Sequence, residues 1–258
     1  MINIILVGAG GIGGNLAPMI ARYMCTNDKI NLTIVDGDVI EKSNLKRQPY
    51  LNGDLEQNKA RALAMKLNAA FGLNVSYYPN YIEDVEGLER LVPKDFDKNR
   101  LSTFSVVIGA VDNAHARNVM EQLFALYDNL VYIDAANEDY FGDVFLGLKI
   151  AKQVLFKSRG MLRPLHISSG TQRVKHNSCE VKSLANPQYY QANMMAATLT
   201  FSILSDFIRE KKVKQPFISF DLDQYSFIRS YIGVEENCEE NYQKLIVEKV
   251  NDRAHLLT

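Results

Sequence analysis

A glycine-rich segment near the N-terminus is the first feature that could do chemistry. VGAGGIGGN carries the spacing G-x-G-x-x-G at Gly8, Gly10 and Gly13, between an apolar run and a stretch with helical spacing. Such glycines let the backbone approach a phosphate, while the helix N-terminus supplies free N–H groups. Asp36 ends the next apolar run, where a carboxylate can bind ribose hydroxyls. The pattern predicts a nucleotide site without separating NAD or FAD from ATP; tight helix–strand packing is the alternative explanation of the glycines.

The charged segment that begins at Asp36, DGDVIEKSNLKRQ, contains more charged and polar residues than a dinucleotide site needs. Arg47 and Lys59 bring cations near the end of the same strand, and Asp112 follows a later apolar run. In a doubly wound sheet these strand ends converge on one crevice. Cations can neutralise charge on transferring phosphates, and a carboxylate can hold Mg²⁺. The segment therefore favours ATP over NAD, with surface salt bridging as the alternative.

The elements that must position these residues alternate between strands and helices. Each expected strand is apolar throughout, which is typical of a parallel sheet covered on both faces. Pro18 should kink the first helix or delay its regular part, and Gly72 is a candidate C-cap. The expected strands are 2–7, 31–36, 74–80, 105–111 and 130–136, and the expected helices are 12–25, 57–71 and 113–127.

The pattern changes after about residue 140. Antiparallel strands are expected within 143–150 and 217–232, and one long helix at 190–212. The polar stretch between them is expected to be a lid that is mobile without substrate. The predicted fold is Rossmann-like: a doubly wound, mostly parallel sheet with helices on both faces, extended by late antiparallel strands. We expect one domain over 1–258, with a nucleotide-binding core at 1–150, a crossover or lid segment at 151–187, and the late helix and strands at 188–258.

Composition excludes several classes of function. The 29 basic and 30 acidic residues give a net charge of -1, which offers no electrostatic case for nucleic acid. No apolar run approaches the ~20 residues of a membrane span, and the N-terminus lacks the basic region of a signal peptide. Cys25, Cys179 and Cys238 are too scattered for a disulfide framework or a four-cysteine zinc site, so a reducing, cytoplasmic setting is expected. We expect Cys25 in the core.

Taken together and in order, the motifs resemble those of the E1/ThiF/MoeB family, whose members activate ubiquitin-like proteins. They are G-x-G-G-x-G at 8–13, D-G-D at 36–38, S-N-L-x-R-Q at 43–48, Lys59, and D-N at 112–113. The resemblance covers residues 2 to about 150, and the late helix with NMMAATL is similar to the family's helix that packs on the nucleotide domain.

The resemblance implies an ATP- and Mg²⁺-dependent adenylation of the C-terminal carboxylate of a small ubiquitin-like or sulfur-carrier protein, releasing pyrophosphate. It also implies a homodimer. Asp36 would bind ribose, Asn44, Arg47, Gln48 and Lys59 would line the phosphates, and Asp112 would hold the metal. The implied nucleotide-binding set is Gly8, Gly10, Gly11, Gly13, Asp36, Asp38, Asn44, Arg47, Gln48 and Lys59, and the implied catalytic set is Arg47, Lys59, Asp112 and Cys179.

The sequence also departs from that family's pattern. It begins at the first strand, so the arginine that an N-terminal arm delivers in homodimeric members must be dispensable or come from elsewhere. The zinc cysteines of several bacterial members are absent. Cys179 has cationic neighbours that could lower its thiol pKa for thioester formation, or it is a packed structural residue. Two other functions stay open: an NAD-dependent oxidoreductase, and a non-catalytic partner subunit.

Overall fold

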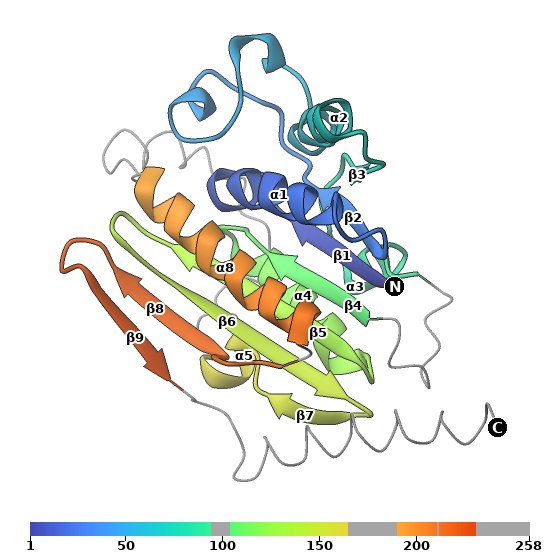
Figure 1. Ribbon diagram of the computed structural model, residues 1–258, viewed down its shortest axis with the longest axis vertical. Helices are drawn as coiled ribbons and strands as arrows, with labels where there is room; N and C mark the ends of the chain where they lie inside the picture. Colours follow the sequence, from blue (N-terminus) through green and yellow to red (C-terminus); the bar gives the residue numbers. More distant parts are fainter. Residues whose placement is uncertain (94–103, 165–189, 211, 231–258) are drawn as a thin grey trace.

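The computed structural model describes residues 1–93, 104–164, 190–210 and 212–230. Within these ranges strands and helices alternate through the first half of the chain (Figure 1). The elements are β1 (Ile2–Val7), α1 (Gly11–Met24), β2 (Ile30–Val35), η1 (Asn44–Lys46), η2 (Asn52–Asp54), α2 (Lys59–Phe71), β3 (Ser76–Tyr78), α3 (Val85–Glu89), β4 (Phe104–Gly109), α4 (Ala114–Leu126), β5 (Leu130–Asn137), β6 (Phe141–Ile150), β7 (Gln153–Phe156), α5 (Arg159–Leu162), α8 (Tyr190–Glu210), β8 (Phe217–Asp221) and β9 (Ser226–Ser230).

The strands form one sheet of nine, in the order β3-β2-β1-β4-β5-β6-β8-β9, with β7 paired to β6. The first five strands are mutually parallel, and β6, β8 and β9 add to them antiparallel. The order reverses between β1 and β4, which is the topological switch point of a doubly wound sheet. The predicted Rossmann-like fold with late antiparallel strands is confirmed.

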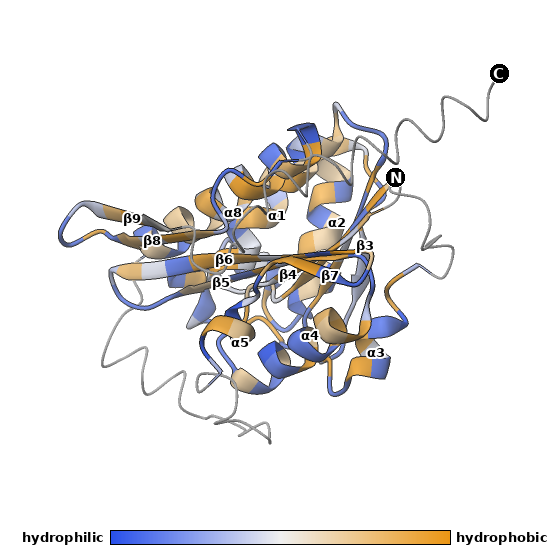
Figure 2. Cartoon of the chain, turned by 90° about the horizontal axis from the view of Figure 1, so that it is seen from below, coloured by the Kyte–Doolittle hydropathy of each residue, from blue (hydrophilic) through white to orange (hydrophobic). Residues whose placement is uncertain are grey.

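Helices cover both faces of the sheet. Seen edge-on, α1, α2 and α8 lie on one side of it, and α3, α4 and α5 lie on the other (Figure 2). Successive residues of β1 point to opposite faces, so Ile4 and Leu6 belong to the core under α1 and α8, while Ile5 and Val7 belong to the core over α4. The uninterrupted apolar runs seen in the sequence follow from this double burial.

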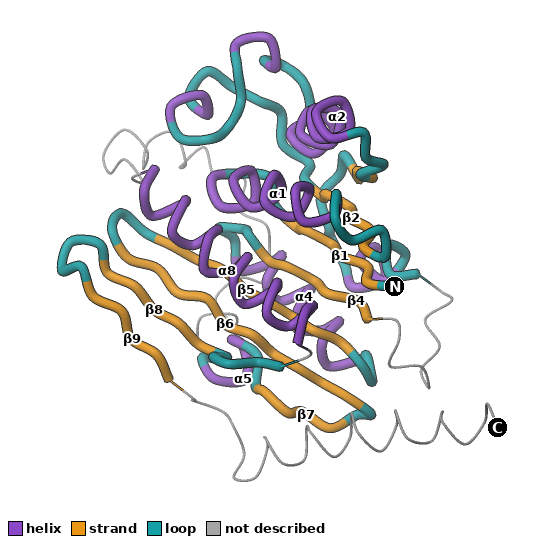
Figure 3. Tube along the Cα trace, in the orientation of Figure 1, coloured by secondary structure: helices purple, strands orange, loops and turns teal. Residues whose placement is uncertain are grey.

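Strand register brings three loops to one edge of the sheet. Val7, the last residue of β1, lies opposite Val35 of β2 on one side and Gly109 of β4 on the other. The segments after these residues therefore start side by side. The loop between β2 and α2, teal in Figure 3, is long and contains the short helical turns η1 and η2.

Several local expectations need correction. Cys25 is the exposed C-cap residue of α1 rather than a residue of the core. Pro18 does not delay the helix, because α1 begins at Gly11 and contains Pro18. The elements β7, α3 and α5 were not predicted, since four or five residues are too few to show a period. Arg159, within the expected lid, is buried in α5, whereas residues 165–189 lie outside the described part.

Candidate nucleotide site

The glycine loop between β1 and α1 is shaped so that two positions accept no side chain. Gly8 has φ +101°, and a Cβ there would lie 2.3 Å from the carbonyl oxygen of Ala110. A Cβ at Gly13 would lie 1.9 Å from the carbonyl oxygen of Gly8. The glycines thus allow β4, the loop and α1 to pack against one another, as well as exposing backbone N–H groups.

The N-terminus of α1 has no internal cap. Gly10 is its N-cap residue, no side-chain cap hydrogen bond is made within the described part of the chain, and its first turn contains no acid. The first N–H groups of any helix lack partners within it, and the helix dipole adds partial positive charge there. In this 14-residue helix that end can bind an anion.

Asp36, the residue after β2, is tied to the glycine loop. Its carboxylate accepts the Ala9 backbone N–H at 2.7 Å through one oxygen and the Asp38 N–H at 2.8 Å through the other. Burial raises the pKa of Asp36 to about 6, and this effect exceeds the opposing pull of nearby Lys59. Asp36 therefore ties the glycine loop to the end of the second strand.

Lys59 is the first residue of α2, and its side chain lies close to the segment that follows β2. Only 8% of its side chain is exposed, and its Nζ lies 2.9 Å from Oδ2 of Asp38. The hydroxyl of Tyr81 donates to the other oxygen of Asp38. Asn58 caps α2 and donates to the carbonyls of Asp36 and Asp38, at 2.8 and 3.2 Å. A buried cation therefore lies beside the predicted ribose carboxylate.

The loop containing S-N-L-x-R-Q closes over the first turn of α1. Gln48 is buried, and its Nε2 is 3.9 Å from where a Cβ on Gly10 would lie. Asn44 is also buried, and its Oδ1 accepts the Glu41 N–H at 3.0 Å, so its side chain shapes this loop. Arg47 is half-buried at the end of η1. Asp112 is exposed in the loop after β4, beside the end of β1.

Tyr50 was not singled out from the sequence, yet it joins three parts of the site. Its hydroxyl donates toward the carbonyl of Ala9 at 2.7 Å and lies 3.3 Å from the carbonyl of Lys59. Burial raises the pKa of Tyr50 well above its usual value, so the hydroxyl keeps its proton. A buried tyrosine after a charged loop has no sequence signature, and its role depends on where α2 folds back.

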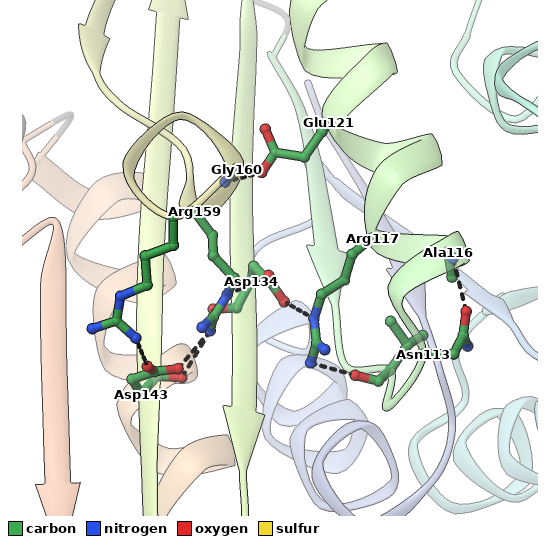
Figure 4. A network of polar contacts seen from close by, with 10 residues as sticks. Asn113, Ala116, Arg117, Glu121, Asp134, Asp143, Arg159 and Gly160 are labelled. Atoms are coloured by element: carbon green, nitrogen blue, oxygen red, sulfur yellow. Dashed lines mark hydrogen bonds and ion pairs between the residues drawn. The ribbon is translucent and has the colours of Figure 1, made fainter. Parts of the chain in front are cut away.

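A second polar cluster joins α4 and α5, which lie on the other face of the sheet, to β5 and β6 (Figures 2 and 4). Arg117 of α4 donates to the carbonyl of Val111 at 2.6 Å and lies 3.3 Å from Asp134 of β5. Because Val111 precedes Asp112, Arg117 holds the base of the loop that follows β4. No sequence motif marks this contact, because it depends on how α4 packs against the end of β4 and against β5.

The same cluster contains a buried arginine. Arg159 bonds Asp134 at 2.5 Å and Asp143 at 2.6 Å, and its guanidinium lies 4.4 Å from the ring centre of Phe145. Burial by itself would lower the pKa of Arg159, but the two carboxylates outweigh it and raise that pKa. Nearby Glu121 accepts the Ser158 hydroxyl and the Gly160 N–H, and burial raises its pKa. These contacts brace β5, β6 and α5.

Cys179 and Cys238 lie outside the described residues. Among the residues that are described, no group of three or more His, Cys, Asp or Glu side chains could by itself hold a metal ion. No helix in those ranges is both long enough and apolar enough to cross a membrane.

The fold and this edge of the sheet define an α/β nucleotide-binding protein of the doubly wound type. The family model described as "ThiF family" matches residues 2–241. The chain belongs to the ThiF family, which confirms the resemblance drawn from the motifs.

Curated relatives match over about half of the chain. The chain is 32% identical over 122 residues to SAMP-activating enzyme E1 of Haloferax volcanii, covering 47% of this chain and 40% of the relative. It is 32% identical over 116 residues to ubiquitin-activating enzyme E1 2 of Arabidopsis thaliana, covering 45% and 10%. The chain thus spans well under half the length of these relatives.

Solved structures share the fold over most of the chain. MccB of E. coli superposes with a TM-score of 0.63 at 19% identity, covering 90% of this chain and 64% of MccB. PaaA superposes with a TM-score of 0.60 at 16% identity, covering 88% and 63%. At these identities the likeness concerns the fold.

Proposed function

We propose that this protein activates a carboxylate by adenylation with ATP. The observation that carries the proposal is the placement of buried Lys59 beside Asp36 and Asp38, at the edge of the sheet where the uncapped N-terminus of α1 begins. A site for NAD uses the glycine loop and a ribose-binding carboxylate. It leaves a buried lysine at this position unexplained, whereas a triphosphate needs a cation there.

In the proposed reaction a carboxylate oxygen of the acyl substrate attacks the α-phosphorus of ATP. A new oxygen–phosphorus bond forms, the bond from the α-phosphorus to pyrophosphate breaks, and the products are an acyl adenylate and pyrophosphate. The chain's part is positioning and charge stabilisation. The ammonium of Lys59 has three N–H donors, so its pairing with Asp38 still allows donation to a phosphate.

The remaining predicted residues take supporting roles in this proposal. Arg47 and Gln48 lie in the loop that closes over α1 and would contact phosphates. Mg²⁺ is commonly bound through one or two carboxylates together with substrate phosphates. The exposed carboxylate of Asp112 fits that arrangement, in which the metal would neutralise charge on the leaving pyrophosphate.

The acyl substrate is proposed to be the C-terminus of a small protein or peptide. Relatives are named as activating enzymes for ubiquitin, SAMP and NEDD8, and MccB has been solved with AMPCPP and MccA and with ATP. A ubiquitin-like modifier, a sulfur carrier and a short peptide each fit a tail that must reach the α-phosphate. A later thioester at Cys179, a homodimer and a cytoplasmic setting belong to the same proposal.

Calorimetric titration of the full chain with ATP and Mg²⁺, and separately with NAD⁺, tests this function. We expect ATP to bind and NAD⁺ not to bind, and Lys59→Met to weaken ATP at least about 10-fold, since a lost charge-assisted hydrogen bond costs ~1.5–3 kcal/mol. The fold should persist, because the side chain of Asp38 is 47% exposed and can hydrate.

Lys66→Met is the matched control. Lys66 lies on the same helix and pairs with another aspartate, Asp54. Its loss should leave the affinity for ATP unchanged. NAD⁺ binding without ATP binding would refute the proposal, and so would equal ATP affinities for the Lys59 and Lys66 variants. Binding of neither nucleotide would favour a non-catalytic partner subunit.

A further inference from the structure

Asn193, in the first turn of α8, lies against the start of α1 at the candidate nucleotide site, although the two segments are far apart in the sequence. The helices α1 and α8 pack side by side on one face of the sheet (Figures 1 and 2). Asn193 is 1% exposed. Its side-chain amide lies flat against Gly11, because a Cβ placed on Gly11 would be 2.5–2.6 Å from all three terminal amide atoms.

The amide nitrogen of Asn193 is buried and has no hydrogen-bond partner among the described residues. Buried polar groups in native proteins are nearly always paired, so each exception requires an explanation. The buried residues nearest to it on α8, Ala192, Ala196 and Ala197, are small and apolar, and an alanine at 193 would avoid the cost of burying an unpaired amide. A packing role therefore does not explain an asparagine here.

A second carboxamide with an unpaired atom lies near the same turn, beside Gly10. Gln48 is 7% exposed, its Oε1 is buried without a partner, and its Nε2 lies near Gly10. Two carboxamides thus lie beside the two glycines that begin α1, whose first N–H groups have no side-chain cap within the described ranges. A carboxamide can present either its oxygen or its N–H₂ group, and an anion on a helix N-terminus accepts from N–H groups.

We propose that Asn193 is a nucleotide-binding residue whose side-chain N–H donates to a phosphate oxygen of the nucleotide seated on the first turn of α1. This inference rests on the proposed function and extends its phosphate site to α8, more than 130 residues beyond the charged loop. Bound phosphate would satisfy the buried amide and would couple α8 to occupancy of the site.

The test compares ATP with adenosine, which lacks phosphates, in calorimetric titrations of the full chain. Asn193→Ala should weaken ATP by about 10- to 100-fold, the effect of removing one hydrogen bond to a charged acceptor. It should leave adenosine affinity unchanged. Because the variant removes an unpaired buried amide, its melting temperature without nucleotide should not fall below that of the wild type.

Thr200→Val is the matched control. Thr200 is a buried polar residue on the same helix, about 10 Å further along its axis, and its hydroxyl bonds the Ala196 carbonyl at 2.7 Å. This variant should bind both ligands as the wild type does. Equal weakening of ATP and adenosine by Asn193→Ala, or no weakening of ATP, would overturn the inference alone. Failure of the wild-type chain to bind ATP would overturn the proposed function and this inference with it.

Discussion

The buried carboxyl group of Asp36 should make the stability of the protein depend on pH in an unusual direction. Carboxylates that are stabilised in the native state make proteins less stable in acid. Asp36 is the opposite case, because burial raises its pKa from 3.8 to about 6. Between those two values the native chain holds a proton that the unfolded chain has released. Stability from this group is therefore fully present below pH 3.8 and is lost as pH rises toward and past 6.

The size of the effect follows from the pKa change. A rise from 3.8 to about 6 corresponds to about 3 kcal/mol of unfolding free energy. About two thirds of that falls between roughly pH 4.5 and 7.5, where most of the native titration occurs. Asp36→Asn removes the titration but also loses one acceptor for the backbone N–H groups of Ala9 and Asp38. The loss of unfolding free energy caused by Asp36→Asn is therefore greatest at low pH, and it shrinks by about 2 kcal/mol across this window.

Urea denaturation of the wild type and of Asp36→Asn at several pH values in that window measures the difference directly. As pH rises, the difference between the free energies of unfolding of the wild type and the variant should shrink. Asp28→Asn, at an exposed aspartate after α1, controls for the loss of a negative charge and should track the wild type. Parallel curves for wild type and Asp36→Asn would show that the carboxyl group is not destabilised by burial, and a difference that changes in the opposite direction would refute the reasoning.

Two further predictions concern the frame around the site. Arg159→Met should lower the free energy of unfolding by about 3 kcal/mol, because buried Asp134 then keeps only the longer 3.3 Å contact with Arg117 and Asp143 loses a buried partner. Arg209→Met in exposed pairs should cost less than about 1 kcal/mol. Urea denaturation measures both, and equal losses would contradict the assignment of Arg159 as the bracing cation. Gly72→Ala should cost about 1 kcal/mol in the same assay through backbone strain at φ +65°, since no atom lies within 4 Å of the added methyl group. Gly53→Ala meets open space without a positive φ and should be near neutral, so similar losses at the two glycines would exclude that cause.

Much of the fold could be predicted because its signals are local. The apolar runs at 2–7 and 105–111 indicated strands buried on both faces, and residue spacing located α1, α2 and α4 to within one or two positions. The late antiparallel strands followed from a change of pattern near residue 140. Short elements such as β7 and α5 were missed because four residues are too few to show a period.

The sequence by itself indicated the residues that are proposed to carry the chemistry. Glycines at positions 8 and 13, the acid at 36 and the cations of the charged loop are recognisable because their types and spacing are local properties of the chain. Only the tertiary structure decided how they meet. Register placed Val35, Val7 and Gly109 at one edge of the sheet, and the return of α2 brought Lys59 to Asp38.

The packing of α8 on α1 likewise set Asn193 against Gly11. Such contacts join residues separated by up to 182 positions, and they are fixed by how buried faces fit together rather than by any neighbouring residue. That is why the sequence indicated a nucleotide site but not the contribution proposed for Asn193 of α8, the position of Tyr50, or the contacts of Arg117 and Arg159.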